Sequence, residues 1–286
     1  MLQSLYKHSS KLKHISIHDV IPFDEVEQAV DDIIINELTK YFSGLKTIDF
    51  TWCCFISDDA LVTISHCCPQ LSKLTVRECH KISDRGVASV LKDCPALSHL
   101  QLERLYNVTD CSFTEGLKGK SQLTELLFLK LVDTAVTDKG IALLAEKSPN
   151  LDSFQALQTL PNNIIGHCIL VISRSCKKLK TFKVLSIKMT DNFMCEIGEH
   201  LHELRHLHLG DCSSVTRAGL MKVINNCPML VKLNLRECPH LDDTVLRIMA
   251  KHLKHLKELE IYGCQNVTAA GIMEVVTCGS DCVVSI

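Results

Sequence analysis

Cysteine and histidine are the residues of this chain with the richest potential chemistry. Its 286 residues include 16 Cys and 14 His, enough for disulfide bonds, zinc sites or a thiolate nucleophile. No two cysteines have the C-x-x-C spacing, and the adjacent pairs Cys53–Cys54 and Cys67–Cys68 cannot alone complete a tetrahedral zinc site. Because the N-terminus has no apolar segment typical of a signal peptide, we expect all sixteen cysteines to be free thiols with structural roles.

One histidine pair matches the motif of zinc proteases. Residues 202–206 read H-E-L-R-H, and H-E-x-x-H on one helix binds zinc with the glutamate as base. Here Leu204 begins a strand pattern, so we expect His202 to end a helix and His206 to lie on the strand that follows. The glycine motifs of phosphate-binding loops and nucleophile elbows do not occur in the sequence. We therefore expect no metal, no cofactor and no enzymatic activity.

The elements that must position these residues come from a repeat. Units with the pattern L-x-x-L-x-L begin 26 residues apart at Leu45, Leu71, Leu97 and Leu123, and again at Leu204, Leu230 and Leu256. The alternation predicts a short strand. A pair such as Ser83-Asp84 then predicts a helix N-terminus, since its oxygens can accept hydrogen bonds from the first amides. Cys94-Pro95 predicts the end of that helix.

Such units bury their apolar faces only by stacking. We predict a single α/β solenoid domain over residues 1–286, with nine or ten repeats, a parallel sheet on its concave face and helices on its convex face. An irregular first unit with a longer helix within 22–42 occupies 1–44, and regular repeats run from 45. Irregular repeats fill 123–203 and regular ones fill 204–281. Nine cysteines fall at core positions of the repeat: Cys53, Cys68, Cys79, Cys94, Cys176, Cys212, Cys227, Cys238 and Cys264.

The unit L-x-x-L-x-L-x-x-C-x-x-[IV]-[ST]-D-x-G resembles the cysteine-containing leucine-rich repeat. This repeat builds the F-box/LRR receptors that hold substrates for SCF-type, cullin-based ubiquitin ligases, and the mitotic-exit antagonist family has it without an F-box. The resemblance implies a horseshoe-shaped protein-binding scaffold with no active site. We find no room for an F-box ahead of the first repeat, so an adaptor and cullin would bind through a segment missing from this chain. The alternative is a stand-alone interaction or inhibitory protein with no ligase link.

Charge and hydropathy limit the classes of partner that we expect. Lys and Arg total 31 against 33 Asp and Glu, a formal net charge of −2, so no cationic excess attracts a nucleic acid. The apolar stretches are too short to span a membrane. We expect a protein partner and a cytoplasmic or nuclear location.

The partner should contact side chains on the concave face. The candidates are Trp52, Arg77, Arg104, Phe128, Val132, Leu157, Leu185, His208, Arg236 and Tyr262. Counting the fourth unit from Leu126 places Phe128 and Val132 in an apolar cluster with Leu157 and Leu185. A register shifted by one residue would instead turn these four side chains into the core, and both readings stay open.

Overall fold

The structure is a computed structural model that describes residues 12–18, 32–41, 43–157, 166–185, 187–278 and 282–286. Contacts within the chain divide it into two compact units, the first unit (1–148) and the second unit (149–286). The single domain over 1–286 stays a prediction. The beginning of the helix expected within 22–42 lies outside the described residues.

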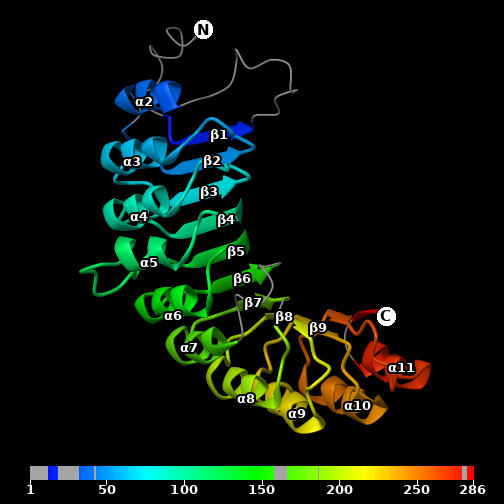
Figure 1. The fold of residues 1–286 in the computed structure, drawn as a ribbon. Helices are drawn as coiled ribbons and strands as arrows, with labels where there is room; N and C mark the ends of the chain where they lie inside the picture. The colour runs from blue at the N-terminus through cyan, green and yellow to red at the C-terminus, as the bar shows by residue number, and fades with distance from the viewer. Residues whose placement is uncertain (1–11, 19–31, 42, 158–165, 186, 279–281) are drawn as a thin grey trace. The chain divides into compact units, whose positions relative to one another are not determined.

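Strands and helices alternate in the first unit. The strands are β1 (His14–His18), β2 (Thr47–Thr51), β3 (Lys73–Arg77), β4 (His99–Leu105) and β5 (Phe128–Thr134). The helices are α2 (Asp32–Tyr41), α3 (Asp58–Cys67), α4 (Asp84–Asp93), α5 (Asp110–Gly116) and α6 (Asp138–Lys147). Neighbouring strands pair in parallel and in chain order, and the helices cover one face of the sheet (Figure 1).

The second unit repeats this arrangement. Its strands are β6 (Ser153–Leu157), β7 (Thr181–Val184), β8 (His206–Asp211), β9 (Lys232–Arg236), β10 (Glu258–Glu260) and β11 (Val283–Ser285). Its helices are α7 (His167–Ser175), α8 (Asp191–His200), α9 (Arg217–Asn226), α10 (Asp243–His252) and α11 (Ala269–Cys278). These strands also pair in parallel in chain order. The described residues thus form eleven strands, more than the nine or ten repeats predicted, because the last residues of the chain add β11.

The core lies between each sheet and its helices. In the repeat from Leu71, the side chains of Leu71, Leu74 and Val76 are 0–1% exposed, which is the period-two burial that the leucine pattern predicts. The helices end where Cys-Pro follows, with Cys68, Cys94 and Cys227 as C-caps. The α/β leucine-rich-repeat solenoid predicted from the sequence is therefore confirmed. Among the described helices, none has the length and apolar character needed to cross a bilayer.

The fifteen cysteines whose side chains the structure describes form no disulfide bonds. Eight of the nine placed at core positions are buried, and Cys264 is half-buried. Burial raises the pKa of Cys68 to about 11 and that of Cys94 to about 12, so these groups stay protonated near neutral pH. The expectation of structural roles for all is wrong for Cys54 and Cys111, which are exposed, because they lie in a turn and on the outer side of a helix.

The repeat start at Leu123 is wrong. Leu100 pairs in register with Leu129, which makes Leu126 the equivalent of Leu97. Leu126 is fully buried, whereas Leu123 is only half-buried. Helix α5 is short, and residues 117–125 are inserted between it and β5, so the local spacing departs from 26 residues.

Candidate protein-binding face

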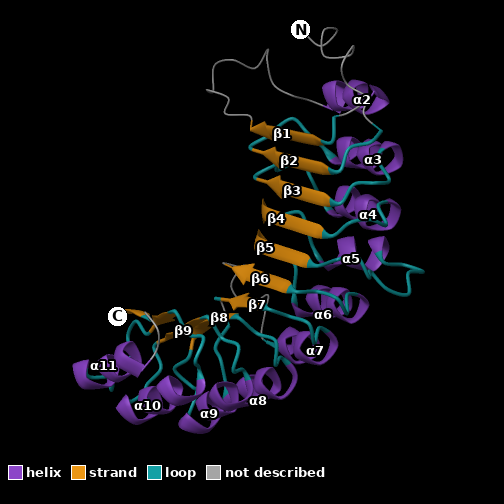
Figure 2. Ribbon diagram, turned by 180° about the vertical axis from the view of Figure 1, so that it is seen from behind, coloured by secondary structure: helices purple, strands orange, loops and turns teal. Residues whose placement is uncertain are grey.

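Each sheet has one face covered by helices and an open face that no described element covers (Figure 2). Open-face side chains stack in rows, because strand residues alternate between this face and the core. The rows of the first unit are Thr47, Lys73, His99 and Phe128; Asp49, Thr75, Gln101 and Lys130; and Thr51, Arg77, Glu103 and Val132.

A further row, here called the rim row, lies at the carboxyl ends of the strands. It consists of Trp52, Glu78, Arg104 and Asp133, with φ angles of 63°, 54°, 52° and 49°. The left-handed backbone is uncommon for non-glycine residues and costs roughly 1–3 kcal/mol each. The ladder extends into this row, since the Trp52 N–H donates to the Arg77 carbonyl and the Glu78 N–H to the Glu103 carbonyl, both at 2.9 Å. The row is thus fixed beside the open face.

Glu103 is the centre of an ion cluster on the open face. Its carboxylate lies 2.7 Å from Arg77 Nε and 2.5 Å from Lys130 Nζ, and it accepts a 2.7 Å hydrogen bond from Gln101. Burial alone would raise the pKa of Glu103. The hydrogen bond and charge of Lys130, with the charge of Arg77, outweigh burial and hold that pKa below its usual value. The group is therefore an anion near neutral pH.

Arg104 forms a second cluster in the rim row. Its Nη1 donates to Glu78 at 2.5 Å, and its Nε lies 3.7 Å from the Asp133 carboxylate. The guanidinium is half exposed, whereas the Glu78 side chain is 10% exposed. The two arginine side chains are thus more exposed than the Glu103 and Glu78 carboxylates that they contact.

The open face of the second unit has a different character. Its central row is Gln155, Lys183, His208, Asn234 and Glu260, and the row beside it is Ser153, Thr181, His206, Lys232 and Glu258. A hollow of about 200 Å³ opens among the side chains of β7 to β10. Lys183 of β7 and Lys232 of β9 line it together with the carboxylates of Glu258 and Glu260 from β10.

Asn234 lies at the floor of this hollow and is 3% exposed. Its Nδ2 donates to His208 Nε2 at 2.8 Å and also to the Glu260 carboxylate. Burial lowers the pKa of His208, and burial also lowers that of His206. Both imidazoles are therefore neutral at pH 7, which suits His208 Nε2 as an acceptor.

Seven of the ten predicted binding residues lie in strands, and Trp52, Leu185 and Tyr262 lie just after the ends of β2, β7 and β10. Trp52 and Tyr262 are 46% and 64% exposed, and Arg236 lies 3.9 Å from Glu260. In β5, the half-buried Phe128 alternates with the buried Leu129 and Leu131, whereas Val132, at the next open-face position, is only 9% exposed. In the second unit, Leu157 and Leu185 are half-buried and follow the buried Ala156 and Val184. The strands therefore do not have the register shifted by one residue. Partner binding by these residues stays a prediction.

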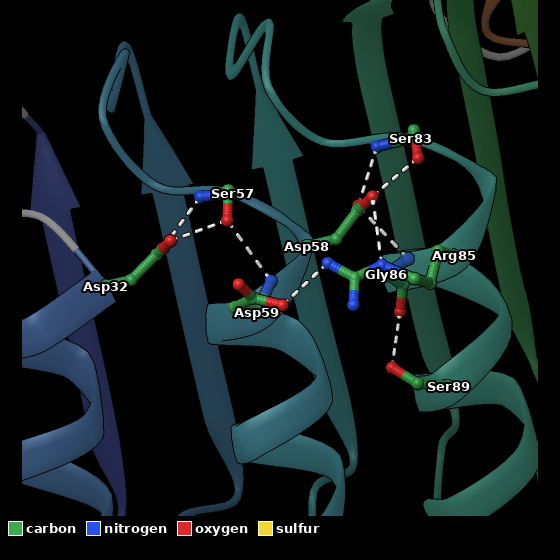
Figure 3. Close-up of polar contacts among 8 residues, drawn as sticks. All are labelled: Asp32, Ser57, Asp58, Asp59, Ser83, Arg85, Gly86 and Ser89. Atoms are coloured by element: carbon green, nitrogen blue, oxygen red, sulfur yellow. Dashed lines mark hydrogen bonds and ion pairs between the residues drawn. The ribbon is translucent and has the colours of Figure 1, made fainter.

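A set of hydrogen bonds that the sequence did not predict joins consecutive repeats through an aspartate, and is here called the staple. The Asp58 carboxylate accepts hydrogen bonds from the Ser83 N–H at 2.8 Å, the Ser83 hydroxyl at 2.5 Å and the Gly86 N–H at 3.1 Å (Figure 3). Asp32 accepts from Ser57 in the same way. The Ser57 hydroxyl also caps its helix as predicted, but the Ser83 side chain makes no cap. The staple thus joins the N-terminal ends of consecutive helices.

The zinc-protease motif does not form a site. His202 follows the end of α8 and its Nδ1 lies 3.1 Å from the Asn226 carbonyl, whereas His206 begins β8. The two rings therefore do not share a helix face, as predicted. Across the described part of the chain, no group of three or more His, Cys, Asp or Glu side chains is placed to hold a metal ion.

The fold is that of a leucine-rich-repeat solenoid, and the comparisons with known proteins agree with this fold. No family model matches the chain. It is 34% identical over 110 residues to F-box/LRR-repeat protein 23 of Arabidopsis thaliana, which is 36% of this chain and 24% of that protein. It is 36% identical over 95 residues to Antagonist of mitotic exit network protein 1 of Eremothecium gossypii, 32% of this chain and 24% of that one.

The likeness extends further in structure than in sequence. A chain in the crystal structure of the yeast Rad7 and Elc1 complex superposes with a TM-score of 0.62 and 19% identity, covering 87% of this chain and 68% of that chain. At that identity the match shows the shared fold. The curated relatives are matched over less than half of their own length. Three of the four are named as F-box/LRR-repeat proteins.

Proposed function

We propose that this chain binds a protein partner on its open face and presents it, as substrate, to an SCF-type ubiquitin ligase. The observation that carries the proposal is the open face itself, which combines exposed aromatic and arginine side chains with an ordered ion network. Tyr, Trp and Arg are enriched at protein interfaces, and buried or paired charges there give specificity. Proteins with this fold commonly bind partners along such extended surfaces.

The ligase link is supported by the relatives. The matched segments include repeats of F-box/LRR-repeat proteins from Arabidopsis thaliana and Bos taurus, and the structural neighbour Rad7 is in complex with Elc1. An F-box segment joined to these repeats would supply contact with an adaptor and cullin, and the repeats would supply the substrate.

A stand-alone interaction or inhibitory protein is the second candidate. The 36% identity to Antagonist of mitotic exit network protein 1 favours it. The two candidates differ in one observable, the presence of adaptor and cullin in the native complex.

Affinity purification of the tagged gene product from cells distinguishes them. We expect F-box adaptor and cullin to co-purify with a substrate protein. The variant Leu157→Asp/Leu185→Asp should lose the substrate and keep its melting temperature, whereas Met273→Asp, at a 57% exposed site on α11, should retain it. A substrate without adaptor or cullin would favour the stand-alone protein. Loss of folding in the double variant would show that those leucines belong to the core.

A further inference from the structure

The first unit presents arginines in front of the carboxylates that hold them. Arg77 and Arg104 side chains are 38% and 50% exposed, whereas Glu103 and Glu78 are 12% and 10% exposed. A molecule that approaches this surface meets guanidinium groups first. Trp52 is 46% exposed and lies in the rim row with Arg104. These three residues, Trp52, Arg77 and Arg104, are here called the arginine patch.

We propose that the arginine patch binds a carboxylate-rich segment of the partner protein, with an apolar side chain of that segment on the Trp52 ring. The proposal rests on the proposed function, since it names the chemistry of the partner on the same open face. Arg77 contacts Glu103 through Nε, and Arg104 contacts Glu78 through Nη1 and Asp133 through Nε. Each guanidinium carries five N–H donors, so donors are left on both to bind an incoming carboxylate.

The internal ion pairs prepare the patch for binding. They hold two long side chains in place before the partner arrives, so less side-chain entropy is lost on association. Charge-assisted hydrogen bonds from arginine to carboxylate are among the stronger polar contacts in proteins. Trp and Arg are also the residues that most often dominate binding energy at interfaces.

The local charge balance favours a protein segment over a polyanion. The two clusters contain three cations, Arg77, Arg104 and Lys130, and three carboxylates, Glu78, Glu103 and Asp133. They are neutral in sum, so no long-range field draws in a phosphate backbone. Recognition must come from direct contact with the outward arginines.

The strand spacing suggests the order of residues in the bound segment. Trp52 and Arg104 lie two strands apart in the rim row. Neighbouring strands are about 4.8 Å apart and an extended peptide advances about 3.3 Å per residue. A segment that crosses the strands would therefore place an acidic residue about three positions from its apolar residue.

Binding of three synthetic peptides tests the proposal. Each is fluorescein-labelled, of equal length, and carries one Leu followed at the third and fourth positions by Glu, Lys or Gln. We expect fluorescence anisotropy to show the Glu peptide binding the purified full chain about tenfold or more tightly than the Lys and Gln peptides. The preference should weaken as salt is raised.

Variants of the patch make the test specific. Arg77→Glu/Arg104→Glu should lose the Glu peptide and prefer the Lys peptide. Arg77→Gln/Arg104→Gln, which adds no like charge beside Glu103, should lose the preference without reversing it. The matched control is Arg247→Glu on α10, half exposed and 2.8 Å from Glu274, which should bind like the native chain. Circular dichroism melts confirm that each variant folds.

Three results would overturn the assignment: a Glu peptide that binds no more tightly than the other two, equal loss in the Arg247→Glu control, or a DNA duplex that binds the patch more tightly than the Glu peptide. The proposed function fails separately. If the cellular partner depends on the open face and the Glu peptide shows no preference, the acidic-segment inference falls and the scaffold function stands. If no partner depends on the open face, the proposed function falls.

Discussion

The two units share the aspartate staple, but only the first carries it without a gap through its described helices. The pairs of the first unit are Asp32–Ser57, Asp58–Ser83, Asp84–Thr109 and Asp110–Thr137. In the second unit the pairs are Asp191–Thr216 and Asp243–Thr268. Between them Arg217 takes the place of the aspartate. Asp242 then takes the place of the next Ser or Thr, caps its own helix through the Val245 N–H at 2.8 Å and lies 4.0 Å from Arg217.

The residue three positions after the Ser or Thr shows what the staple demands. Two of the six stapled repeats have Ala60 and Ser112 there. The other four have glycine, and a Cβ would come 2.5, 2.3, 2.3 and 2.2 Å from the preceding aspartate Oδ1 at Gly86, Gly140, Gly219 and Gly271. After Arg217 the same position is Val245, and after His167, which begins α7, it is Phe193. A small residue therefore occurs at this position where the preceding repeat supplies an aspartate carboxylate, and the helix alone does not require it. Within one chain, the contrast identifies which glycines serve the staple.

Removing a staple aspartate should give the largest difference in stability between variants of the first unit and of the second unit. Asp58→Ala leaves three donors of the next repeat without their acceptor, and we expect a loss of about 3 kcal/mol in the free energy of unfolding. Asp242→Ala, in the gap of the second unit, removes one cap hydrogen bond and should cost about 1 kcal/mol. Urea unfolding measures both. Equal losses would show that the staple contributes no more than an ordinary cap.

Filling the space beside the carboxylate should have the next largest effect. In Gly86→Ala the new Cβ would lie 2.5 Å from Asp58 Oδ1 and 3.0 Å from a Leu61 methyl, so we expect about 2 kcal/mol of destabilisation. Alanine also favours the helix, so without the clash the change would be stabilising. In an Asp58→Ala background the cost should therefore shrink or change sign. Strict additivity in this double-mutant cycle would contradict the link between glycine and aspartate.

Cysteine at the same repeat position should matter more in the first unit than near the end of the second. Cys79 is fully buried, with Sγ 3.4 Å from the Arg77 carbonyl, whereas Cys264 is half-buried. We expect Cys79→Ser to cost roughly 1–2 kcal/mol, because a hydroxyl replaces an apolar packing group. Cys264→Ser should cost less, and the exposed Cys111→Ser should stay within about 0.5 kcal/mol. Thermal melts rank the three variants, and the reverse order would refute the packing role.

The repeat predicted most of this fold because each leucine of the period is also a core contact. One repeat start was predicted wrongly, at Leu123 where the structure has Leu126. Leu123 preserved the 26-residue spacing, and the inserted residues 117–125 have no periodicity of their own. The staple was missed for another reason. A Ser-Asp pair is typical of a helix cap. The aspartate binds the Ser or Thr of the next repeat, about one repeat length away, and a local sequence pattern does not predict such a contact. Glycine at the third position, present only after an aspartate, was the available signal.

The open face was predictable in position and less so in chemistry. Alternation along the strands places Arg77 and His208 on it, but which groups pair depends on the register between repeats. Sequence spacing alone did not show that Glu103 would bind both Arg77 and Lys130. Nor did it show that Asn234 would be buried between His208 and Glu260.

Acid should loosen the open face of the second unit, the smallest effect expected. Burial lowers the pKa of His208, with Lys183 and Arg236 also lowering it and Glu260 opposing them. The unfolded imidazole titrates near 6.5, so between that value and the lower folded pKa the unfolded state binds more protons. Stability from this group is thus present above pH 6.5 and is lost as the pH falls from the unfolded pKa through the folded one. Hydrogen-exchange protection of β8 and β9 should fall a few-fold between pH 7.5 and pH 5.5, by our order-of-magnitude estimate. His208→Gln should remove the part of that change that His208 causes and leave the part from His206, whose pKa burial also lowers. An equal fall in β3 and β4 of the first unit would show that the loosening has another source.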